Sequence, residues 1–357
     1  KTHSFSLKGT GPITFHLGCD YFRDKEGRLC YAAKKYIEKL MGAYQRMFGS
    51  LPKERQSPLP KGDHAELETS ELLDDEGASK YQSLIGGLQW IIQLGRFDIQ
   101  TATMTMSRFR AAPRHGHLER VKRIFGYLRK WSDATIRIRT EPPDMSDLPE
   151  KQYSWENSVY GDAHEEIPDD CPTPKGKHIV FTSFVDANLM HELLSGKSVT
   201  GIIHMFNGTP IDWFSKLQNT VETATFGSEF VAMRTCVEQI IDLRTTMRYL
   251  GVPVSEPTIV FGDNESMINS ASHPHGRLAK RHVALSYHKV RWSVAAKIIR
   301  CHHIPGTNNP ADILSKHWDW PSVWPNLKQL LFNEGPLKLG HKLSTDTSPN
   351  PSSEKDQ

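Results

Sequence analysis

The sequence predicts an α/β fold for its second half, with a mixed five-stranded sheet and flanking helices, preceded by a smaller, mainly helical α+β part. Three observations predict this arrangement. Apolar segments in residues 178–320 follow the order βββαβαβα. Apolar residues recur at helical spacing through much of residues 31–130. Between the two parts, residues 141–177 carry six prolines and ten acidic residues, which is typical of a linker.

The first part, residues 1–140, begins with short predicted strands, because apolar residues alternate at Ile13, Phe15 and Leu17. A loop is predicted where the chain is polar and rich in proline. This loop covers residues 50–78. Helices are predicted over residues 31–48, over 79–95 with Ser79 as N-cap, and over two segments divided at Ala112-Pro113.

The second part, residues 178–320, supplies the predicted sheet. Asn207-Gly208 between two apolar segments is a strong signal for a β-hairpin. In such sheets, ligands bind at the carboxyl ends of the parallel strands. The predicted strands are 179–186, 199–206, 210–214, 258–261 and 297–304, and the predicted helices are 225–250, 285–296 and one that starts at Asn309 and Pro310. The Ser-, Thr- and Pro-rich residues 341–357 predict a disordered tail.

Four carboxylates lie at the ends of these apolar segments. Asp186 and Asp263 each end a predicted strand, Glu229 lies on the sheet-facing side of the long helix, and Asp312 lies in the first turn of the last helix. Each alone has an ordinary explanation, such as a turn or the helix dipole. Together, however, they predict a site for Mg²⁺ or Mn²⁺, and two such ions are a common device for cutting phosphodiesters.

A family resemblance is carried by several segments, namely GPITFHLGCDYFRDKEGRLCYAAKKYIEKLM, YQSLIGGLQWIIQLGRFDIQTATMTMSRF, HLERVKRIFGYLRK, SVTGIIHMFNGTPIDWFSKLQNTVETATFGSEFVAM, GDNESMI, KRHVALSYHKVR and IPGTNNPADILSK. In these segments the chain resembles the C-terminal part of a copia-type LTR-retrotransposon polyprotein, where the end of the reverse transcriptase precedes the ribonuclease H domain. The resemblance covers roughly residues 5–318. It implies that residues 1–140 are similar to the late palm, thumb and connection of the polymerase.

For the second part, the resemblance implies a ribonuclease H-like fold and an enzyme that cleaves the RNA strand of RNA–DNA hybrids. It also implies that Asp186, Glu229, Asp263 and Asp312 match the four metal-binding carboxylates of the family. We hypothesise two Mg²⁺ or Mn²⁺ ions, with Asp186 as the shared ligand, Glu229 and Asp263 on one ion and Asp312 on the other.

The sequence departs from the family in two places. The polymerase's Tyr-x-Asp-Asp hairpin has no counterpart, so the chain alone is not expected to polymerise. Cellular ribonucleases H also carry a histidine in a mobile loop before the last aspartate. Here His302 and His303 lie within a predicted strand, and whether either takes that role is left open.

Nucleic-acid contacts are expected next to the carboxylates and from two basic segments. Side chains beside the metal ligands are candidates for contacting 2′-hydroxyl groups, and basic side chains in residues 277–291 and 108–130 for holding phosphates. For residues 277–291, a solvated basic helix face is an equal alternative. The candidates are Ser228, Asn264, Lys280, Arg281, Arg291, Arg120, Lys122 and Arg123.

Charge and cysteine content limit the classes of partner and compartment. Residues 1–140 carry 24 basic and 15 acidic residues, a balance that favours a polyanionic partner. The five scattered cysteines lack any C-x-x-C and argue for a reducing compartment. No apolar run approaches the ~20 residues of a membrane span, so we expect no membrane partner. We expect a location in the cytoplasm, within a virus-like particle, or in the nucleus, but not secretion. Possible protein partners are the polymerase palm and the integrase of the same polyprotein.

Three other functions are compatible with parts of this pattern. The chain could be a catalytically dead, nucleic-acid-binding remnant of a retroelement, although all four carboxylates are present. It could be an integrase or transposase, but it has no upstream His/Cys zinc module. It could also be a polymerase subunit that works only with a separate palm-containing partner.

Overall fold

The structure is a computed structural model that describes residues 11–146, 148–149, 153–278 and 281–334. The predicted tail at 341–357 lies outside the described residues. Within them, no helix is long and apolar enough to cross a membrane.

The second part of the chain forms a five-stranded sheet in the order β7-β6-β5-β8-β9. The first three strands are antiparallel neighbours, and β8 and β9 run parallel to β5. The α/β fold class predicted from the sequence is therefore confirmed, with a mixed five-stranded sheet. The strands are β5 (Phe181–Glu192), β6 (Lys197–Phe206), β7 (Thr209–Leu217), β8 (Thr258–Gly262) and β9 (Ile299–His303).

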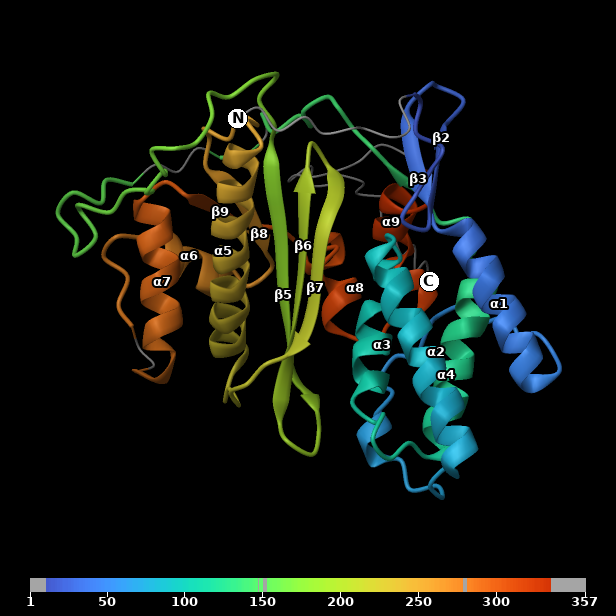
Figure 1. Ribbon diagram of the computed structural model, residues 1–357. Coiled ribbons are helices and arrows are strands. Elements are labelled where there is room, and N and C mark those ends of the chain that lie inside the picture. The colour runs from blue at the N-terminus through green and yellow to red at the C-terminus, as the bar shows by residue number, and fades with distance from the viewer. Residues whose placement is uncertain (1–10, 147, 150–152, 279–280, 335–357) are drawn as a thin grey trace, which may run out of the picture.

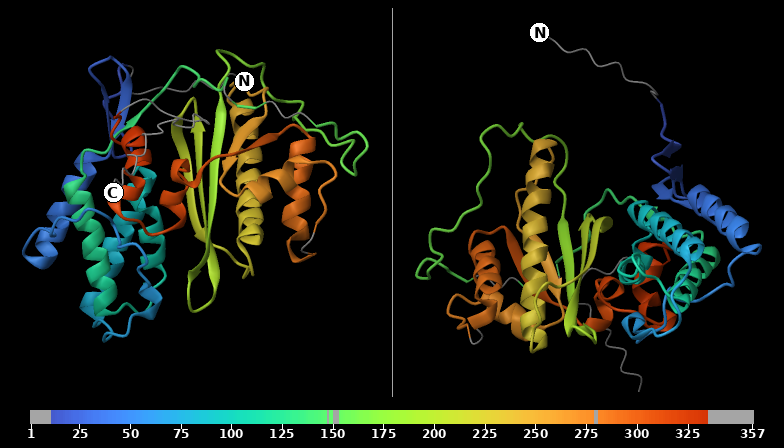
Figure 2. Two further views of the ribbon diagram at one scale, coloured as in Figure 1. Left: turned by 180° about the vertical axis from the view of Figure 1, so that it is seen from behind. Right: turned by 60° about the horizontal axis from the view of Figure 1, so that its bottom comes forward.

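Helices cover both faces of this sheet (Figure 1). On one face lie α5 (Thr225–Tyr249), α6 (Glu265–Ser272) and α7 (Ala284–Ala295). On the other face lie α8 (Asp312–Ser315) and α9 (Trp320–Leu330), together with the helices of the first part. Figure 2 shows the sheet as the middle layer between these two groups.

The first part of the chain combines a small antiparallel sheet with four longer helices. The sheet has the order β1-β2-β3-β4, so that β4, which follows the helices in sequence, returns to the strands at the start. The strands are β1 (Phe15–His16), β2 (Cys19–Arg23), β3 (Leu29–Ala32) and β4 (Ile136–Arg137). The helices are α1 (Lys34–Phe48), α2 (Asp75–Gln93), α3 (Gln100–Ser107) and α4 (His115–Lys130).

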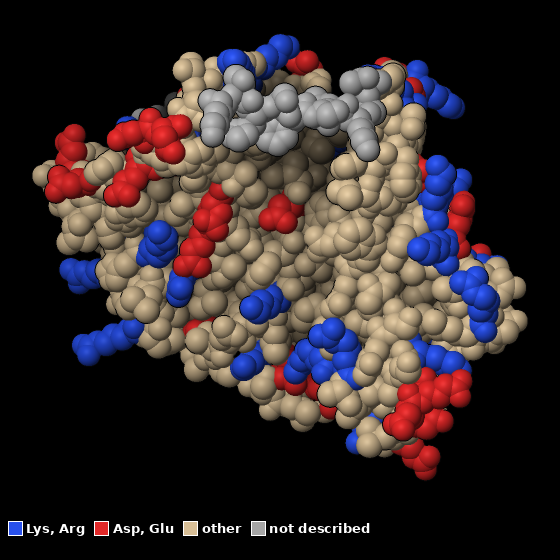
Figure 3. Space-filling view, viewed as in Figure 1, with Lys and Arg blue, Asp and Glu red and all other residues tan. Residues whose placement is uncertain are grey.

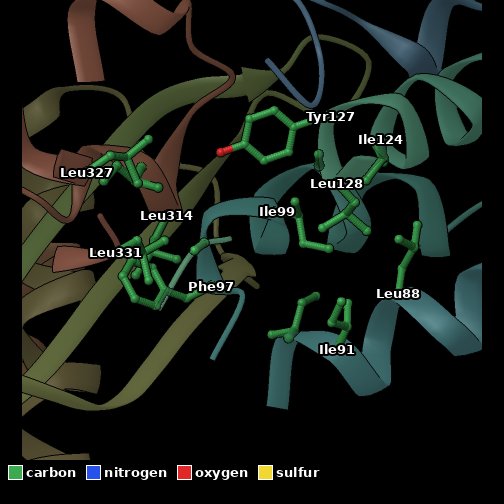
Figure 4. Packing of buried hydrophobic residues seen from close by; sticks show 14 of the residues in the cluster. Leu88, Ile91, Phe97, Ile99, Ile124, Tyr127, Leu128, Leu314, Leu327 and Leu331 are labelled. Atoms are coloured by element: carbon green, nitrogen blue, oxygen red, sulfur yellow. The ribbon is translucent and has the colours of Figure 1, made fainter. Parts of the chain in front are cut away.

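One hydrophobic core joins the helices of the first part to the sheet and C-terminal helices of the second. Figure 4 shows Leu314, Leu327 and Leu331 of the C-terminal segment facing Phe97 and Ile99 of the first part. A buried hydrogen bond of 3.1 Å, from the Thr101 hydroxyl to the Ile313 carbonyl, lies at the same junction. The last catalytic candidate, Asp312, is thus carried by a segment that packs against the first part.

Several element boundaries differ from the prediction. Helix α2 begins at Asp75 rather than near residue 79, because the Asp74 side chain accepts a hydrogen bond of 2.8 Å from the Gly77 amide and caps it. The described part of the crossover from β8 to β9 contains α6 as well as α7, whereas the sequence predicted only the helix that corresponds to α7. The helix predicted to start at Asn309 and Pro310 is α8, which begins at Asp312, so Asn309 is not its N-cap. Helix α9, which follows it, was not predicted.

The predicted linker, residues 141–177, contains no helix or strand within its described residues. Part of it is nevertheless held firmly against α5. The Glu165 carboxylate accepts paired hydrogen bonds of 2.7–2.8 Å from the buried guanidinium groups of Arg244 and Arg248. The composition of this acidic segment is typical of a solvated linker, but the contacts of Glu165 show that part of the segment is bound to α5.

Candidate metal centre

Three of the four predicted carboxylates converge on one point. Asp186, Asp263 and Asp312 each offer an oxygen, and these oxygens lie within 4.8 Å of one another. Asp186 is buried, and the other two are partly exposed. Oxygens at this spacing can bind one divalent cation together, whereas carboxylates without a cation would repel one another.

The parallel pairing of β5 and β8 brings Asp186 and Asp263 together. Phe184 pairs with Phe261, so the end of β8 at Gly262 lies beside Val185, and Asp263 emerges next to Asp186. Asp186 does not end its strand, as the sequence suggested, because β5 continues to Glu192 in its ladder with β6. Asp186 therefore lies at the edge where the neighbouring strand β8 ends, although its own strand continues.

Glu229 approaches from the first turns of α5, whose buried face packs on β5. Its side chain is 4% exposed, and its Oε2 atom has no hydrogen-bond partner within the described part of the chain. A buried carboxylate oxygen without a donor is costly unless a cation binds it. The donor set therefore fits a divalent ion.

Asp312 is positioned by contacts that fix the segment between β9 and α8. The Asn309 side chain donates a 2.9 Å hydrogen bond to the Val185 carbonyl of β5 and accepts one of 3.1 Å from the Ala311 amide. The Ser315 hydroxyl, one turn of α8 later, donates to Asp186. Side chains on both sides of Asp312 thus anchor α8 to the strand that carries Asp186.

The electrostatics of the cluster reflect burial and crowding of like charges. Burial, and then the charges of Asp186 and Asp263, raise the pKa of Glu229 well above its usual value. Burial, and then the charge of Asp186, also raise the pKa values of Asp263 and Asp312. Groups with shifted pKa values that gather at one edge of a sheet are typical of functional sites.

One cation of the chain itself lies in the cluster. The Lys316 ammonium group is 2.7 Å from Asp312 Oδ1 and 3.9 Å from Asp186 Oδ2. Burial would lower the pKa of Lys316, but Asp186 and Asp312 outweigh it and raise that pKa. We did not predict Lys316, Ser315 or Asn309 from the sequence. The four-residue spacing from Asp312 to Lys316 was the available signal, since such residues are neighbours on a helix.

Two predicted nucleic-acid contacts are wrong because the residues are buried in the protein. Arg291 is 2% exposed and donates to the carbonyls of Ser270, His273 and Pro274 at 2.5–2.7 Å. Ser228 is fully buried, and its hydroxyl donates to the Thr225 carbonyl at 2.9 Å. Neither side chain is available to a phosphate or a 2′-hydroxyl group.

The predicted contacts on α4 have partners within the protein. Arg120 binds the carboxylates of Asp63 and Glu68, and is therefore an internal bridge rather than a free phosphate ligand. Lys122 pairs with Glu119 at 2.8 Å, and Arg123 donates to the Ser57 hydroxyl at 3.2 Å.

The remaining candidates near the site differ in their positions. Asn264 caps α6 by accepting a 3.0 Å hydrogen bond from the Met267 amide, next to Asp263. Arg281 is exposed, and Lys280 lies outside the described residues. His303 in β9 lies 3.1 Å from the Asp263 carbonyl through its Nε2 atom, and His302 is buried in the same strand.

The visible surface shows no single basic field. In Figure 3, lysine and arginine side chains are interspersed with acidic ones over the face on which α5 lies. The excess of basic residues in residues 1–140 is thus not gathered into one patch on this face.

Comparison with known proteins finds similarity to retroelement sequences. No family model matches it. It is 25% identical over 320 residues to the retrovirus-related Pol polyprotein from transposon TNT 1-94 of Nicotiana tabacum, covering 88% of this chain and 21% of that protein. The chain resembles copia-type retrotransposon Pol polyproteins over most of its length.

A second such polyprotein, from transposon RE1 of Arabidopsis thaliana, is 22% identical over 312 residues, covering 87% of this chain and 18% of the polyprotein. The chain spans about a fifth of the length of these relatives. The resemblance inferred from the sequence segments is thereby confirmed.

Solved structures with similarity to the chain include ribonuclease H domains. LC11-RNase H1, isolated from compost, is 15% identical, with a TM-score of 0.31, and covers 38% of this chain and 92% of its own. The foamy viral protease-reverse transcriptase in complex with an RNA/DNA hybrid is 13% identical, with a TM-score of 0.27, and covers 46% of this chain and 20% of its own. The strand order and connections described above, rather than these scores, carry the fold assignment.

Proposed function

We propose that this chain of retroelement origin is a metal-dependent endonuclease that cleaves the RNA strand of RNA–DNA hybrids. The convergence of Asp186, Asp263 and Asp312 within 4.8 Å, beside the buried Glu229, carries the proposal. The resemblance to Pol polyproteins supports a nucleic acid as substrate.

The four carboxylates would hold Mg²⁺ or Mn²⁺. When bound, two such ions would activate the attacking water and offset charge on the leaving 3′ oxygen. Asp186 is the central residue, because it lies next to Asp263 through the β5–β8 pairing and is joined to α8 by Ser315. Glu229 closes the site from the side of α5, and burial keeps competing water away from its carboxylate.

The test is cleavage of a labelled RNA–DNA hybrid in Mg²⁺ or Mn²⁺ by the wild type and by Asp263→Asn. Asp242→Asn on the exposed side of α5 is a matched control, since it removes one charge far from the cluster. We expect the wild type and the control to cut the RNA strand and Asp263→Asn to be inactive. Cleavage by Asp263→Asn at the wild-type rate would refute the proposal.

A non-catalytic, hybrid-binding remnant is the second candidate. The observation that favours it is the Lys316 ammonium group, which already neutralises part of the carboxylate charge. Hybrid binding without cleavage in either metal, by a folded wild type, would support this candidate. The same result in the presence of a separately supplied polymerase palm would exclude a simple requirement for that partner.

A further inference from the structure

Lys316 occupies the place of a cation in the carboxylate cluster. It follows α8 directly, so its side chain extends back over the turn that carries Asp312 and reaches Asp186 on β5. Among the described residues, Lys316 is the basic residue that forms ion pairs with both Asp186 and Asp312. An ammonium ion and a divalent metal compete for the same oxygens, because both need the negative charge at short distance.

The surroundings of Lys316 leave its side chain room to move. The side chain is 40% exposed, unlike the buried guanidinium groups that hold other parts of the fold. It also lines a cavity of about 260 Å³ that extends away from the carboxylates, together with His64, Asn188 and His191. Asn188 and His191 are hydrogen-bonded to each other at 2.8 Å. Asp63 also lines the cavity, but its carboxylate is already paired with Arg120 at 2.9 Å, so the lining offers the ammonium group no unpaired acid.

We propose that Lys316 is a counter-ion built into the metal site: its ammonium group stays beside Asp186 and Asp312 until a divalent ion displaces it into the adjoining cavity. Lys316 thereby lowers the affinity of the site for metal, and it neutralises part of the carboxylate charge while no metal is bound. The inference rests on the metal site of the proposed function and adds a residue that sets its metal affinity.

The first experiment measures Mn²⁺ binding to the full chain by electron paramagnetic resonance of the free ion. Lys316→Met removes the competing charge and should bind Mn²⁺ about fivefold more tightly or better, the range of a typical coupling between two sites. Lys316→Arg keeps the charge and should bind as the wild type does. Lys39→Met on the exposed side of α1 is the matched control and should also leave the affinity unchanged. Equal or weaker binding by Lys316→Met would overturn the inference.

A second measurement needs no variant and so does not depend on whether Lys316→Met folds. Acylation of lysines in the wild type, followed by mass spectrometry, reports how free each ammonium group is. Adding Mg²⁺ should speed the acylation of Lys316 and leave Lys39 in the same molecule unchanged. An unchanged rate at Lys316 at a saturating Mg²⁺ concentration would contradict displacement.

The two proposals fail in different ways. Tighter Mn²⁺ binding by Lys316→Met without hybrid cleavage by the wild type would support the counter-ion and refute the nuclease. Hybrid cleavage by the wild type with unaltered Mn²⁺ affinity in Lys316→Met would support the nuclease and refute the counter-ion.

Discussion

Gly201 pairs with Asp186 in the β5–β6 ladder, and its missing side chain makes room for the helix that carries Asp312. A Cβ atom at Gly201 would lie 2.6 Å from the Ala311 carbonyl oxygen and 2.8 Å from the Leu314 carbonyl carbon and the Ser315 amide nitrogen. The backbone of α8 therefore lies directly on β6. A position without a side chain thus permits the close approach of α8, which carries Asp312, to the strand beside Asp186.

Gly201→Ala should separate the carboxylates without unfolding the protein. The new methyl group meets backbone atoms, which cannot rotate away, so α8 must move and take Asp312 with it. We expect a stability loss of about 1–3 kcal/mol, as for other overpacked positions, and a clear loss of Mn²⁺ affinity. Denaturant unfolding and Mn²⁺ titration measure the two effects.

Gly86→Ala in α2 is the control, because a Cβ atom there meets nothing within 4 Å. That variant should bind Mn²⁺ normally and gain about 0.5–1 kcal/mol of stability from helix propensity. Normal Mn²⁺ affinity in Gly201→Ala would show that α8 is not held by this contact.

Glu229→Gln should stabilise the metal-free protein while abolishing its response to metal. The folded state raises the pKa of Glu229 through burial and the nearby aspartates, so the ionised carboxylate opposes folding at neutral pH. The neutral amide removes that charge, with an expected gain of about 1–3 kcal/mol in the absence of metal. Urea unfolding with and without Mg²⁺ tests this, and a variant less stable than the wild type in chelator would contradict it.

Glu165→Gln should destabilise the protein in a pH-dependent way. Burial alone would raise the pKa of Glu165, but Arg244 and Arg248 outweigh it and lower this pKa to about 2. A lowered pKa means that the ion pairs stabilise the fold fully above the ordinary value of 4.5, and that this stabilisation is lost as pH falls toward about 2.

At pH 7 the loss in Glu165→Gln should be about 3–5 kcal/mol, because two largely buried guanidinium groups lose their partner. The stability difference from the wild type should shrink between pH 4.5 and about 2. Glu166→Gln, at the next position, is the control. A stability difference that does not change over this pH range would mean that the charge of Glu165 is not what holds the segment.

Arg120→Met should weaken the fold rather than the binding of nucleic acid. The Arg120 guanidinium group bridges Asp63 and Glu68. The hydrogen bond from the Ser70 amide, and then Arg120, lower the pKa of Glu68 to about 2. We expect a stability loss of about 3 kcal/mol when these carboxylates lose their partner. The dependence of hybrid binding on salt should be unchanged, since that slope counts phosphates contacted by cations.

Arg110→Met changes an exposed arginine near the same helix, and the salt dependence of its hybrid binding is compared with that of Arg120→Met. A shallower salt dependence in Arg120→Met, at temperatures where the variant is folded, would restore Arg120 as a phosphate contact.

The sequence by itself determined the order of the five strands in the second half, and it predicted four carboxylates, three of which the structure brings together. Both are local signals. Alternation and helical spacing of apolar residues appear within each segment, and Asn207-Gly208 fixes the hairpin between β6 and β7. The resemblance in residues 5–318 likewise needed only the order of residues.

The tertiary structure alone decided which polar side chains face the site and which are buried and hydrogen-bonded within the protein. Arg291 and Ser228 look like surface candidates in the sequence, yet both are buried and hydrogen-bonded to backbone carbonyls. The spacing from Asp312 to Lys316 shows that these two residues can be neighbours on a helix, but only the fold brings Lys316 near Asp186. The contacts of Arg291 with Ser270 and of Lys316 with Asp186 join residues distant in sequence. They depend on close packing such as that of α8 on Gly201, which local patterns of residues do not encode.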